Sequence, residues 1–522
     1  MDIMRTKACL LAIVLPVLLS CGGNKVTVSE IMIEDKVFGG WAGKVIGVQF
    51  GQPHEFWHLS RINEGELSWT PELIDGAVGQ DDIYTQLSFL GTFDKYGLDA
   101  TADQLAGEFA QAGFELFHAN LQAKKNWFDG LRPPATGSAA YNAHADDIDF
   151  QIDADFIGLM CPGMPGLVRE YCDRIGPIMC DGDGIYGGVF IATMQSLAFF
   201  EDDMLGIVEG ALKNIPSESG YARCVADVVE SYKTDPADWK AAWNVVHERW
   251  ERHVCTPGHP FDIDAKVNGA YVVIGLLYGG GDFRKTMEIA VRCGQDADCN
   301  ASNAAAVWGV VHGYEAIPSE YRDCLARIEG RKFSHTDYDF HESARKILEF
   351  MKLNIVKGGG SVRGDRLTVK METPCAEEVC RVSFPGMTCS QSIPSDDTAW
   401  SYTGNWHRFT EFGDAPFIET VEIGATAEVG FDGEMVTLIG AWDTDCGKAD
   451  VFIDGKQVRR IDSWWKYRCG FISINRQVLF VASGLEPGHH TLRIETVEER
   501  SPESSGNRLM FTGIDVYSSK PI

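Results

Sequence analysis

Apolar side chains recur with a helical period through the first two thirds of the chain. Spacings of three and four residues between apolar positions are typical of amphipathic helices. Strand-like alternation is almost absent before about residue 354. The pattern therefore predicts an all-α domain over residues 35–354. The predicted helices cover residues 37–51, 81–96, 102–117, 167–175, 189–200, 203–213, 218–232, 236–251, 266–279, 283–293, 302–313 and 340–352.

The pattern changes after a glycine-rich stretch at residues 357–361, which predicts a linker over residues 355–364. Beyond it, apolar and polar residues alternate in short runs separated by Asp-Gly and Pro-Gly turns. Short strands at regular spacing with such turns are typical of a β-sandwich. Residues 365–522 are therefore expected to form a second, all-β domain. A chain of 522 residues has the length of two or three domains.

The first residues have the pattern of an export signal. Arg5 and Lys7 precede an apolar run over residues 8–19, and the sequence Leu-Leu-Ser-Cys ending at Cys21 resembles a bacterial lipobox. The apolar run is shorter than the roughly 20 residues of a spanning helix. We expect a signal peptide over residues 1–20, a lipid on Cys21, and a tether over residues 21–34. The protein would then be an exported, membrane-anchored lipoprotein in the periplasm or on the cell surface; a plain secretory signal and an internal helix are the alternatives.

Glycines recur every four residues in the first predicted helix, at Gly39, Gly43, Gly47 and Gly51. Each glycine inside a helix costs about 1 kcal/mol relative to alanine. The spacing puts the glycines on one helical face, which lets another helix approach closely. A phosphate-binding loop fits poorly because no Gly-Lys-Ser/Thr follows.

Two predicted helices begin with pairs of carboxylates. Asp81 and Asp82 follow Gln80 directly before an apolar-periodic run, and Asp296 and Asp298 precede an alanine-rich run. Acids near a helix N-terminus cap free N–H groups and suit the helix dipole, but capping needs only one acid. Two acidic helix starts far apart in sequence suggest one shared site for a hard cation, with paired helix caps as the alternative.

The charge of the chain limits its partners. The formal net charge is −29, which argues against binding to a nucleic-acid backbone, because that requires a basic face. No CxxC pair or zinc-type Cys/His spacing occurs. Cys375 and Cys380 could form a disulfide in an oxidising compartment, although nothing in the sequence fixes a connectivity. The spacing of His144, His253, His259 and His312 does not suggest metal ligands, so structural or surface roles are expected.

Taken together, the motifs of the helical half resemble those of the ADP-ribosylglycohydrolase family, of the dinitrogenase-reductase-activating glycohydrolase type. The glycine-rich first helix resembles the family's Gly-Asp-Ala-Leu-Gly segment. Residues 79–82 (Gly-Gln-Asp-Asp) fall at the family's Thr-Asp-Asp-Thr motif, residues 294–299 (Gly-Gln-Asp-Ala-Asp-Cys) at its Gly-Gly-Asp-Thr-Asp-Thr motif, and residues 313–318 (Gly-Tyr-Glu-Ala-Ile-Pro) at its Ile-Pro ending. The similarity covers roughly residues 35–350.

This resemblance implies an all-helical fold around two divalent cations, usually Mg²⁺ or Mn²⁺, with Ca²⁺ as a further choice. Asp81, Asp82, Asp296 and Asp298 would be ligands by matching position, and Gln80 offers a carbonyl oxygen where the family has threonine. Oxygen ligands suit hard cations. Two such ions could bind sugar hydroxyls, position a water, and stabilise charge as the bond at the anomeric carbon breaks.

The chain also departs from the family pattern. Lys44 replaces the aspartate of the Gly-Asp pair, Cys299 replaces a threonine ligand, and Gly51 stands where an acid is expected, with Glu55 as the only nearby substitute. In place of two further family motifs, an Arg-containing one and a Thr-His pair, the sequence offers the acids Asp155 and Asp183. Extra acids would repel a pyrophosphate unless cations offset them, and they suit a neutral sugar cleaved by carboxylates. Glu55, Asp155 and Asp183 are therefore the candidate catalytic residues.

The C-terminal half resembles a carbohydrate-binding jelly-roll module, through residues 448–456 and 483–494. Five tryptophans could stack on sugar faces, or could belong to the core or to an interface: Trp400, Trp406, Trp442, Trp464 and Trp465.

Two functions are therefore compatible with the sequence. One is a metal-dependent hydrolase of a ribosyl-type or other glycosidic bond, acting on a sugar or ADP-ribosyl substrate outside the cytoplasm. The other is a surface glycan-binding lipoprotein whose helical domain has lost catalysis. The substitutions at the family motifs favour the second function, and the four retained aspartates favour the first.

Overall fold

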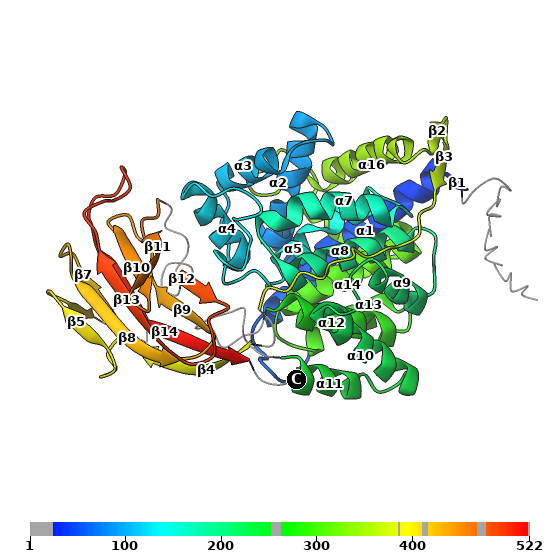
Figure 1. Ribbon diagram of the computed structural model, residues 1–522. Helices are drawn as coiled ribbons and strands as arrows, with labels where there is room; N and C mark the ends of the chain where they lie inside the picture. The colour runs from blue at the N-terminus through cyan, green and yellow to red at the C-terminus, as the bar shows by residue number, and fades with distance from the viewer. Residues whose placement is uncertain (1–24, 252–262, 385–386, 410–415, 467–476, 520–522) are drawn as a thin grey trace, which may run out of the picture.

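The computed structural model describes residues 25–251, 263–384, 387–409, 416–466 and 477–519. A helical body and a β-sandwich lie side by side (Figure 1). This arrangement confirms the expected multidomain fold, all-α followed by all-β. The expected signal peptide and Cys21 lie outside the described residues. No described helix is both long and apolar enough to span a bilayer.

The helical body is built almost entirely from α-helices and short 3₁₀ segments. The α-helices are α1 (Glu30–Gly51), α2 (Asp81–Tyr96), α3 (Ala102–Gln111), α4 (His118–Phe128), α5 (Asp149–Asp153), α6 (Asp155–Leu159), α7 (Pro165–Ile175), α8 (Gly182–Ala198), α9 (Met204–Leu212), α10 (Gly220–Thr234), α11 (Trp239–Arg249), α12 (Ala265–Tyr278), α13 (Phe283–Arg292), α14 (Ala297–His312), α15 (Ser319–Arg322) and α16 (Phe340–Lys357). The 3₁₀ segments are η1 (Gln52–His54), η2 (Pro71–Gly79), η3 (Gly176–Ile178), η4 (Tyr314–Ala316) and η5 (Asp323–Ile328).

The central packing of the helical body is the contact between α1 and α14. Their backbones approach so closely that a Cβ on Gly43 would lie 2.1 Å from the carbonyl oxygen of Ala305. A Cβ on Gly47 would lie 2.4 Å from that of Ala301. The four-residue glycine spacing thus forms a helix–helix contact, as the sequence predicted. Because α1 and α14 are both buried along most of their length, their contact fixes the position of the α14 N-terminus.

Fourteen described strands form three antiparallel sheets. They are β1 (Lys25–Ser29), β2 (Ser361–Arg363), β3 (Arg366–Lys370), β4 (Met387–Pro394), β5 (Ser401–Thr403), β6 (His407–Phe409), β7 (Phe417–Thr420), β8 (Thr426–Asp432), β9 (Met435–Gly440), β10 (Lys448–Ile453), β11 (Lys456–Asp462), β12 (Gln477–Ser483), β13 (His489–Thr496) and β14 (Leu509–Ser519). The sandwich pairs one sheet in the order β11-β10-β13-β8-β5 with another in the order β12-β9-β14-β7-β6, and β4 pairs with β14. Its core takes the inward residues of both sheets, such as Val451, Leu492 and Val516.

The boundaries at both ends of the helical domain differ from the sequence-based ones. Residues 25–34 are not a tether, because β1 pairs with β3 from Lys25 opposite Lys370 to Ser29 opposite Arg366, and α1 begins at Glu30. Val28, Leu367 and Val369 are buried and join the helical core. Tertiary burial of these apolar side chains stabilises a sheet that is too short to predict from its own pattern.

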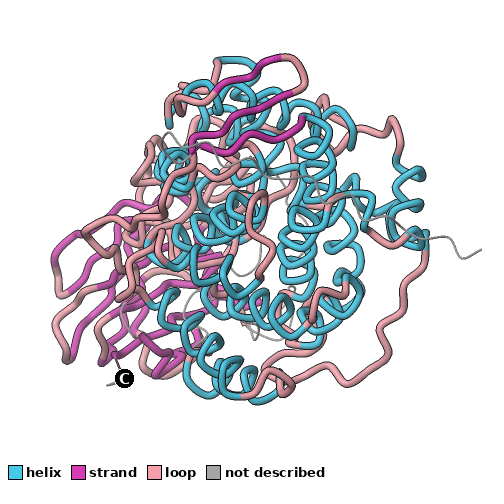
Figure 2. The backbone as a smooth tube through the Cα atoms, turned by 90° about the vertical axis from the view of Figure 1, so that its right-hand side faces the viewer, coloured by secondary structure: helices cyan, strands magenta, loops and turns pink. Residues whose placement is uncertain are grey.

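The small β1-β3-β2 sheet lies at the end of the helical body opposite the sandwich (Figures 1 and 2). The chain returns from it across the helices before the sandwich begins at Met387. On the way Glu372 accepts the Gly166 N–H at the start of α7, and Glu377 accepts the Tyr186 hydroxyl at 2.7 Å. The second domain therefore starts about twenty residues later than expected.

Most of the tryptophans singled out in the sequence serve the core. Trp400, Trp442 and Trp465 are buried, whereas Trp406 and Trp464 are half-buried. Cys375 and Cys380 are both free thiols.

Candidate active site

The carboxylates of two distant helix starts meet in the structure. The ligand atoms of Asp82, Asp298 and Cys299 lie within 4.8 Å of one another, and so do those of Glu55, Asp296 and Asp298. Asp298 belongs to both groups and joins them into one centre, which we call the carboxylate centre. Of the four aspartates expected to share a site, Asp82, Asp296 and Asp298 lie in these groups and Asp81 does not, while Glu55 lies beside Asp296 and Asp298.

Helix packing and a tight turn hold the centre together. Gly51 ends α1 directly against α14, where a Cβ would lie 2.4 Å from the Asp298 Cα. Next to it, Phe56 and Gln295 both adopt left-handed backbone conformations, with φ of 56° and 54°. The Phe56 N–H donates to the Gln295 carbonyl at 3.0 Å. Left-handed conformations of such residues cost on the order of 1–3 kcal/mol and are frequent at functional sites.

Burial and mutual repulsion raise the pKa values of the carboxyl groups in and beside the centre. Burial, followed by repulsion from Asp82, raises the pKa of Asp81 and of Asp298 to about 7. Burial, followed by repulsion from Asp298, raises the pKa of Glu55 to about 9. The pKa of Asp296 is also raised well above its ordinary value, by burial and then by Asp298.

Unpartnered oxygens show that these residues fit a bound cation. The Oδ1 atoms of Asp82, Asp296 and Asp298 are buried and have no hydrogen-bond partner, and of these Asp82 Oδ1 lies 3.5 Å from the ammonium of Lys44. Leaving a buried carboxylate oxygen unpaired is costly, and a divalent cation with oxygen ligands removes that cost. Cys299 donates its thiol to Asp82 at 3.3 Å, so it supports a carboxylate at the position where the family has a threonine ligand.

The ammonium group of Lys44 places a positive charge at one edge of the centre. Its side chain is fully buried, and Nζ lies 2.7 Å from Asp155 and 3.5 Å from Asp82. It also donates to the Ile152 carbonyl at 3.0 Å. Burial by itself would lower the pKa of Lys44, but Asp155 and Asp82 outweigh burial and raise it.

Asp155 and Asp183 occupy other surroundings than the sequence suggested. Asp155 is buried in a pair with Lys44 and accepts hydrogen bonds from Gln195 and Asn303, which leaves it sequestered rather than open to a substrate. Asp183 accepts the Tyr221 N–H at 3.0 Å and lies 4.0 Å from Lys266. Among the described residues, neither belongs to the acid groups of the carboxylate centre.

Gln80 contributes to the start of α2 through its backbone carbonyl. It precedes α2, and its carbonyl accepts the N–H groups of Ile83 and Tyr84 at 3.1 and 3.0 Å. Its side chain is half-buried and makes no capping hydrogen bond. The role of its amide oxygen as a ligand stays a prediction.

A second polar cluster lies beside the centre and was missed in the sequence. His144 Nδ1 lies 3.1 Å and His118 Nδ1 lies 3.9 Å from the same oxygen of Asp147. Nearby, Asn120 donates to Asp149 and Asp153, and the carboxylate of Asp149 repels that of Asp81. His118 and His144 are far apart in sequence, so no spacing motif could indicate their contact. His253 and His259 lie outside the described residues.

Two proteins of known activity match parts of this chain. The chain is 26% identical over 181 residues to an A type blood α-D-galactosamine galactosaminidase of Flavonifractor plautii, and 32% identical over 109 residues to an A type blood N-acetyl-α-D-galactosamine deacetylase of the same organism. These matches cover 31% and 20% of this chain but only 16% and 13% of the relatives.

A solved structure described as an ADP-ribosylglycohydrolase-related protein complex aligns with 62% of this chain and 99% of its own, at 16% identity and a TM-score of 0.36. The model of one family, ADP-ribosylglycohydrolase, matches residues 29–353, which is more than half of the chain and contains every acid of the carboxylate centre. The chain therefore belongs to the ADP-ribosylglycohydrolase family.

Proposed function

We propose that this protein hydrolyses a glycosidic bond at the carboxylate centre and requires a divalent cation. The observation that carries the proposal is the convergence of buried carboxylates whose unpartnered oxygens need a positive charge. Membership of a glycohydrolase family supports the reaction type.

Asp82, Asp296 and Asp298 would hold the cation, with Asp81 beside them. All donors are oxygens, which favours Mg²⁺ or Mn²⁺ over softer metals, with Ca²⁺ as an alternative. When bound, such an ion supplies Lewis-acid stabilisation of negative charge on a sugar oxygen or an activated water. Lys44 offsets part of the charge of Asp82 and Asp155, and the family resemblance implies two ions for the remaining carboxylates.

Glu55 is suited to donate a proton to the departing oxygen. It is less buried than Asp296 and Asp298, and burial followed by repulsion from Asp298 raises the pKa of its carboxyl in the metal-free centre. A protonated carboxyl beside ionised ones is the arrangement that glycosidases use for general acid catalysis. Asp155 would act as a positioning residue that holds Lys44 against Asp82.

The substrate that this acidic site favours carries no phosphate. Excess negative charge at the centre would repel the pyrophosphate of ADP-ribose, whereas a neutral sugar or an amino sugar meets no such repulsion. The activities for which the two relatives are named suggest galactosamine-type glycans as the first substrates to test. A lipid on Cys21 would place the protein outside the cytoplasm, where such glycans occur.

A second function is a glycan-binding lipoprotein without catalysis. The sequestered Asp155 and the thiol of Cys299 favour it, since both replace groups that the family resemblance would place at a working site.

The decisive experiment combines Asp296→Asn with metal titration. We expect Mg²⁺ or Mn²⁺ to raise the stability of the EDTA-treated wild type by about 3 kcal/mol at a hundredfold excess over Kd. Asp296→Asn should abolish both this rise and the turnover of aryl α-galactosaminides. Asp103→Asn, at an exposed acid of α3, is the matched control and should change neither. Turnover that survives Asp296→Asn would contradict the proposed centre, and absence of turnover with sugar binding intact would favour the second function.

A further inference from the structure

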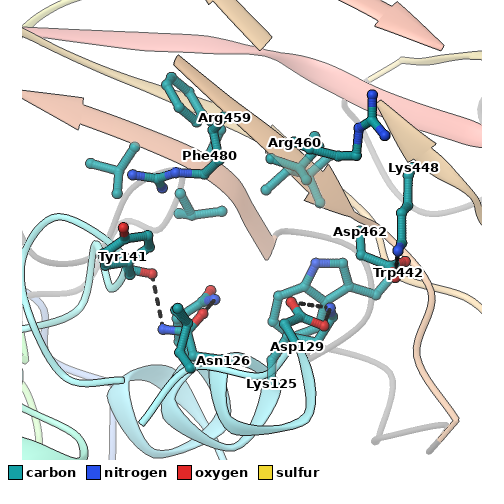
Figure 3. Close-up of a pocket in the computed structure, with 16 residues that line it drawn as sticks. Lys125, Asn126, Asp129, Tyr141, Trp442, Lys448, Arg459, Arg460, Asp462 and Phe480 are labelled. Carbon is teal, nitrogen blue, oxygen red and sulfur yellow. Dashed lines mark hydrogen bonds and ion pairs between the residues drawn. The ribbon is translucent and has the colours of Figure 1, made fainter. Parts of the chain in front are cut away.

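A cavity lies between the two domains, away from the carboxylate centre. Its volume is about 310 Å³, and it is lined by α4 and Tyr141 on the helical side and by β11, β12 and Trp442 on the sandwich side (Figure 3). This volume is at the lower end of small-ligand sites, which suits one or two sugar units.

The helical side of the cavity is polar and ordered. Gln122 donates to the Asn126 side chain at 3.0 Å, and Asn126 in turn donates to the Thr136 and Tyr141 carbonyls. Lys125 pairs with Asp129 at 2.6 Å. These hydrogen bonds hold the polar wall of the cavity in a fixed geometry, and polar groups in such a wall are of the kind that recognise sugar hydroxyls.

The sandwich side of the cavity is apolar and aromatic. Ile461, Val478 and Phe480 line it, and the Trp442 ring borders the floor made by α4. Apolar and aromatic walls opposite polar groups are typical of sites for sugars, whose rings have C–H faces and hydroxyl edges.

One cation of the cavity has no counter-charge. Lys448 pairs with Glu499 at 2.7 Å and Arg460 pairs with Asp450 at 2.7 Å. Arg459, by contrast, has no carboxylate within ion-pair distance among the described residues.

The guanidinium of Arg459 is held in a fixed position by neutral groups. It stacks on Tyr141 and Phe480, with centroid distances of 4.4 and 5.0 Å, and donates to the Ala140 carbonyl at 2.6 Å. Burial lowers the pKa of Arg459. These neutral contacts leave the half-buried guanidinium without a counter-charge among the described residues, and an anionic ligand would supply one.

We propose that this interdomain cavity binds an acidic sugar, with Arg459 pairing with its carboxylate or sulfate group. A guanidinium held flat by aromatic rings offers two parallel N–H donors to either anion. The site is independent of the proposed hydrolysis. Helix α4 nevertheless runs from the cavity towards the acids beside the carboxylate centre. Its Asn120 contacts Asp149 and Asp153, and Lys125, which lines the cavity, follows about 8 Å farther along the helix.

Calorimetry of the full chain with three oligosaccharides tests the proposal. The probes are an oligogalacturonide, a galactose oligomer that carries sulfate, and the neutral galactose oligomer of the same length. We expect at least tenfold tighter binding of one of the anionic probes than of the neutral one, and a preference that falls with salt. The relative affinities of the two anionic probes identify the anionic group. Equal affinity for all three probes would overturn the proposal.

Substitutions at Arg459 separate charge from a purely structural role. Arg459→Gln should abolish the preference for the anionic probe, and Arg459→Lys should keep part of it. Lys456→Gln removes one positive charge from an exposed position on β11 and should leave the preference for the anionic probe unchanged. If Arg459→Gln does not fold, competition of the wild type by inorganic sulfate replaces it, and failure of sulfate to displace the anionic probe overturns the proposal. A folded Arg459→Gln protein that still prefers the anionic probe would also overturn the proposal.

Discussion

At the residue scale, the site depends on balancing buried charges that the chain itself provides. Lys44 lies with no solvent exposure between Asp155 and Asp82. Transfer of such charges from water is expensive, and only good geometry and further hydrogen bonds compensate for it. The donors to Asp155 from Gln195 and Asn303 supply those bonds.

Replacing Lys44 with methionine should destabilise the protein strongly. The change leaves Asp155 and part of Asp82 buried without a counter-charge, which typically costs about 3–5 kcal/mol. Chemical denaturation measures the loss. The double variant Lys44→Met/Asp155→Leu should recover part of it, because only Asp82 then lacks its counter-charge.

The control for this prediction is Lys95→Met. Lys95 forms an exposed pair with Glu108 at 2.7 Å, and exposed pairs contribute little. Equal destabilisation by Lys44→Met and Lys95→Met would show that the buried pairing does not stabilise the fold.

At the element scale, one helix pair positions the site. The glycine face of α1 lets α14 approach closely, and this contact places Asp296 and Asp298 beside the residues that follow α1. Glycine reduces the intrinsic stability of α1, so tertiary packing must stabilise that helix.

Gly43→Ala should destabilise the protein by about 1–3 kcal/mol or more, because its Cβ would lie 2.1 Å from a backbone carbonyl that cannot move alone. Gly91→Ala in α2 is the matched control. Its Cβ would meet its nearest neighbour, Tyr338, at 3.7 Å, so the better helix propensity of alanine should stabilise by about 0.5–1 kcal/mol. Thermal or denaturant unfolding of the two variants measures both effects, and a stabilising Gly43→Ala would contradict the close approach.

At the scale of the whole molecule, the carboxylate centre makes stability depend on pH. Asp81 and Asp298 have ordinary pKa values of 3.8, which the fold raises to about 7. Between these values the folded protein binds more protons than the unfolded chain. Stability must therefore fall as pH rises through this window. Repulsion within a chain of net charge −29 acts in the same direction.

Unfolding free energies measured in EDTA should therefore decrease from pH 5 to pH 8. Saturating Mg²⁺ or Mn²⁺ should reduce this decrease, because the cation stabilises the ionised carboxylates of the folded state. Asp298→Asn should flatten the EDTA profile without any metal. A profile in EDTA that rises over this range would show that the carboxylates are not destabilised by burial.

The sequence was sufficient for the parts of the structure that arise from local pattern. The start and end of α2 follow from its periodicity, and the glycine spacing of α1 predicted a close helix contact. The convergence of Asp82 with Asp296 and Asp298 was inferred from shared motif chemistry. The β1–β3 pairing was not predictable, because the five-residue β1 pairs with a strand at residues 366–370, far away in sequence, and both are stabilised by burial against the helical core.

What the sequence by itself determined is therefore the fold class and the two acidic helix starts, since both depend on periodicity or residue type. Only the tertiary structure decided which charges neutralise one another. It paired Lys44 with Asp155, separated Asp183 from the carboxylate centre, and brought His118 and His144 to Asp147. It also left Arg459 without an ion pair among the described residues. The physical reason is that Coulomb interactions and desolvation depend on distance and burial in three dimensions, which spacing along the chain does not specify.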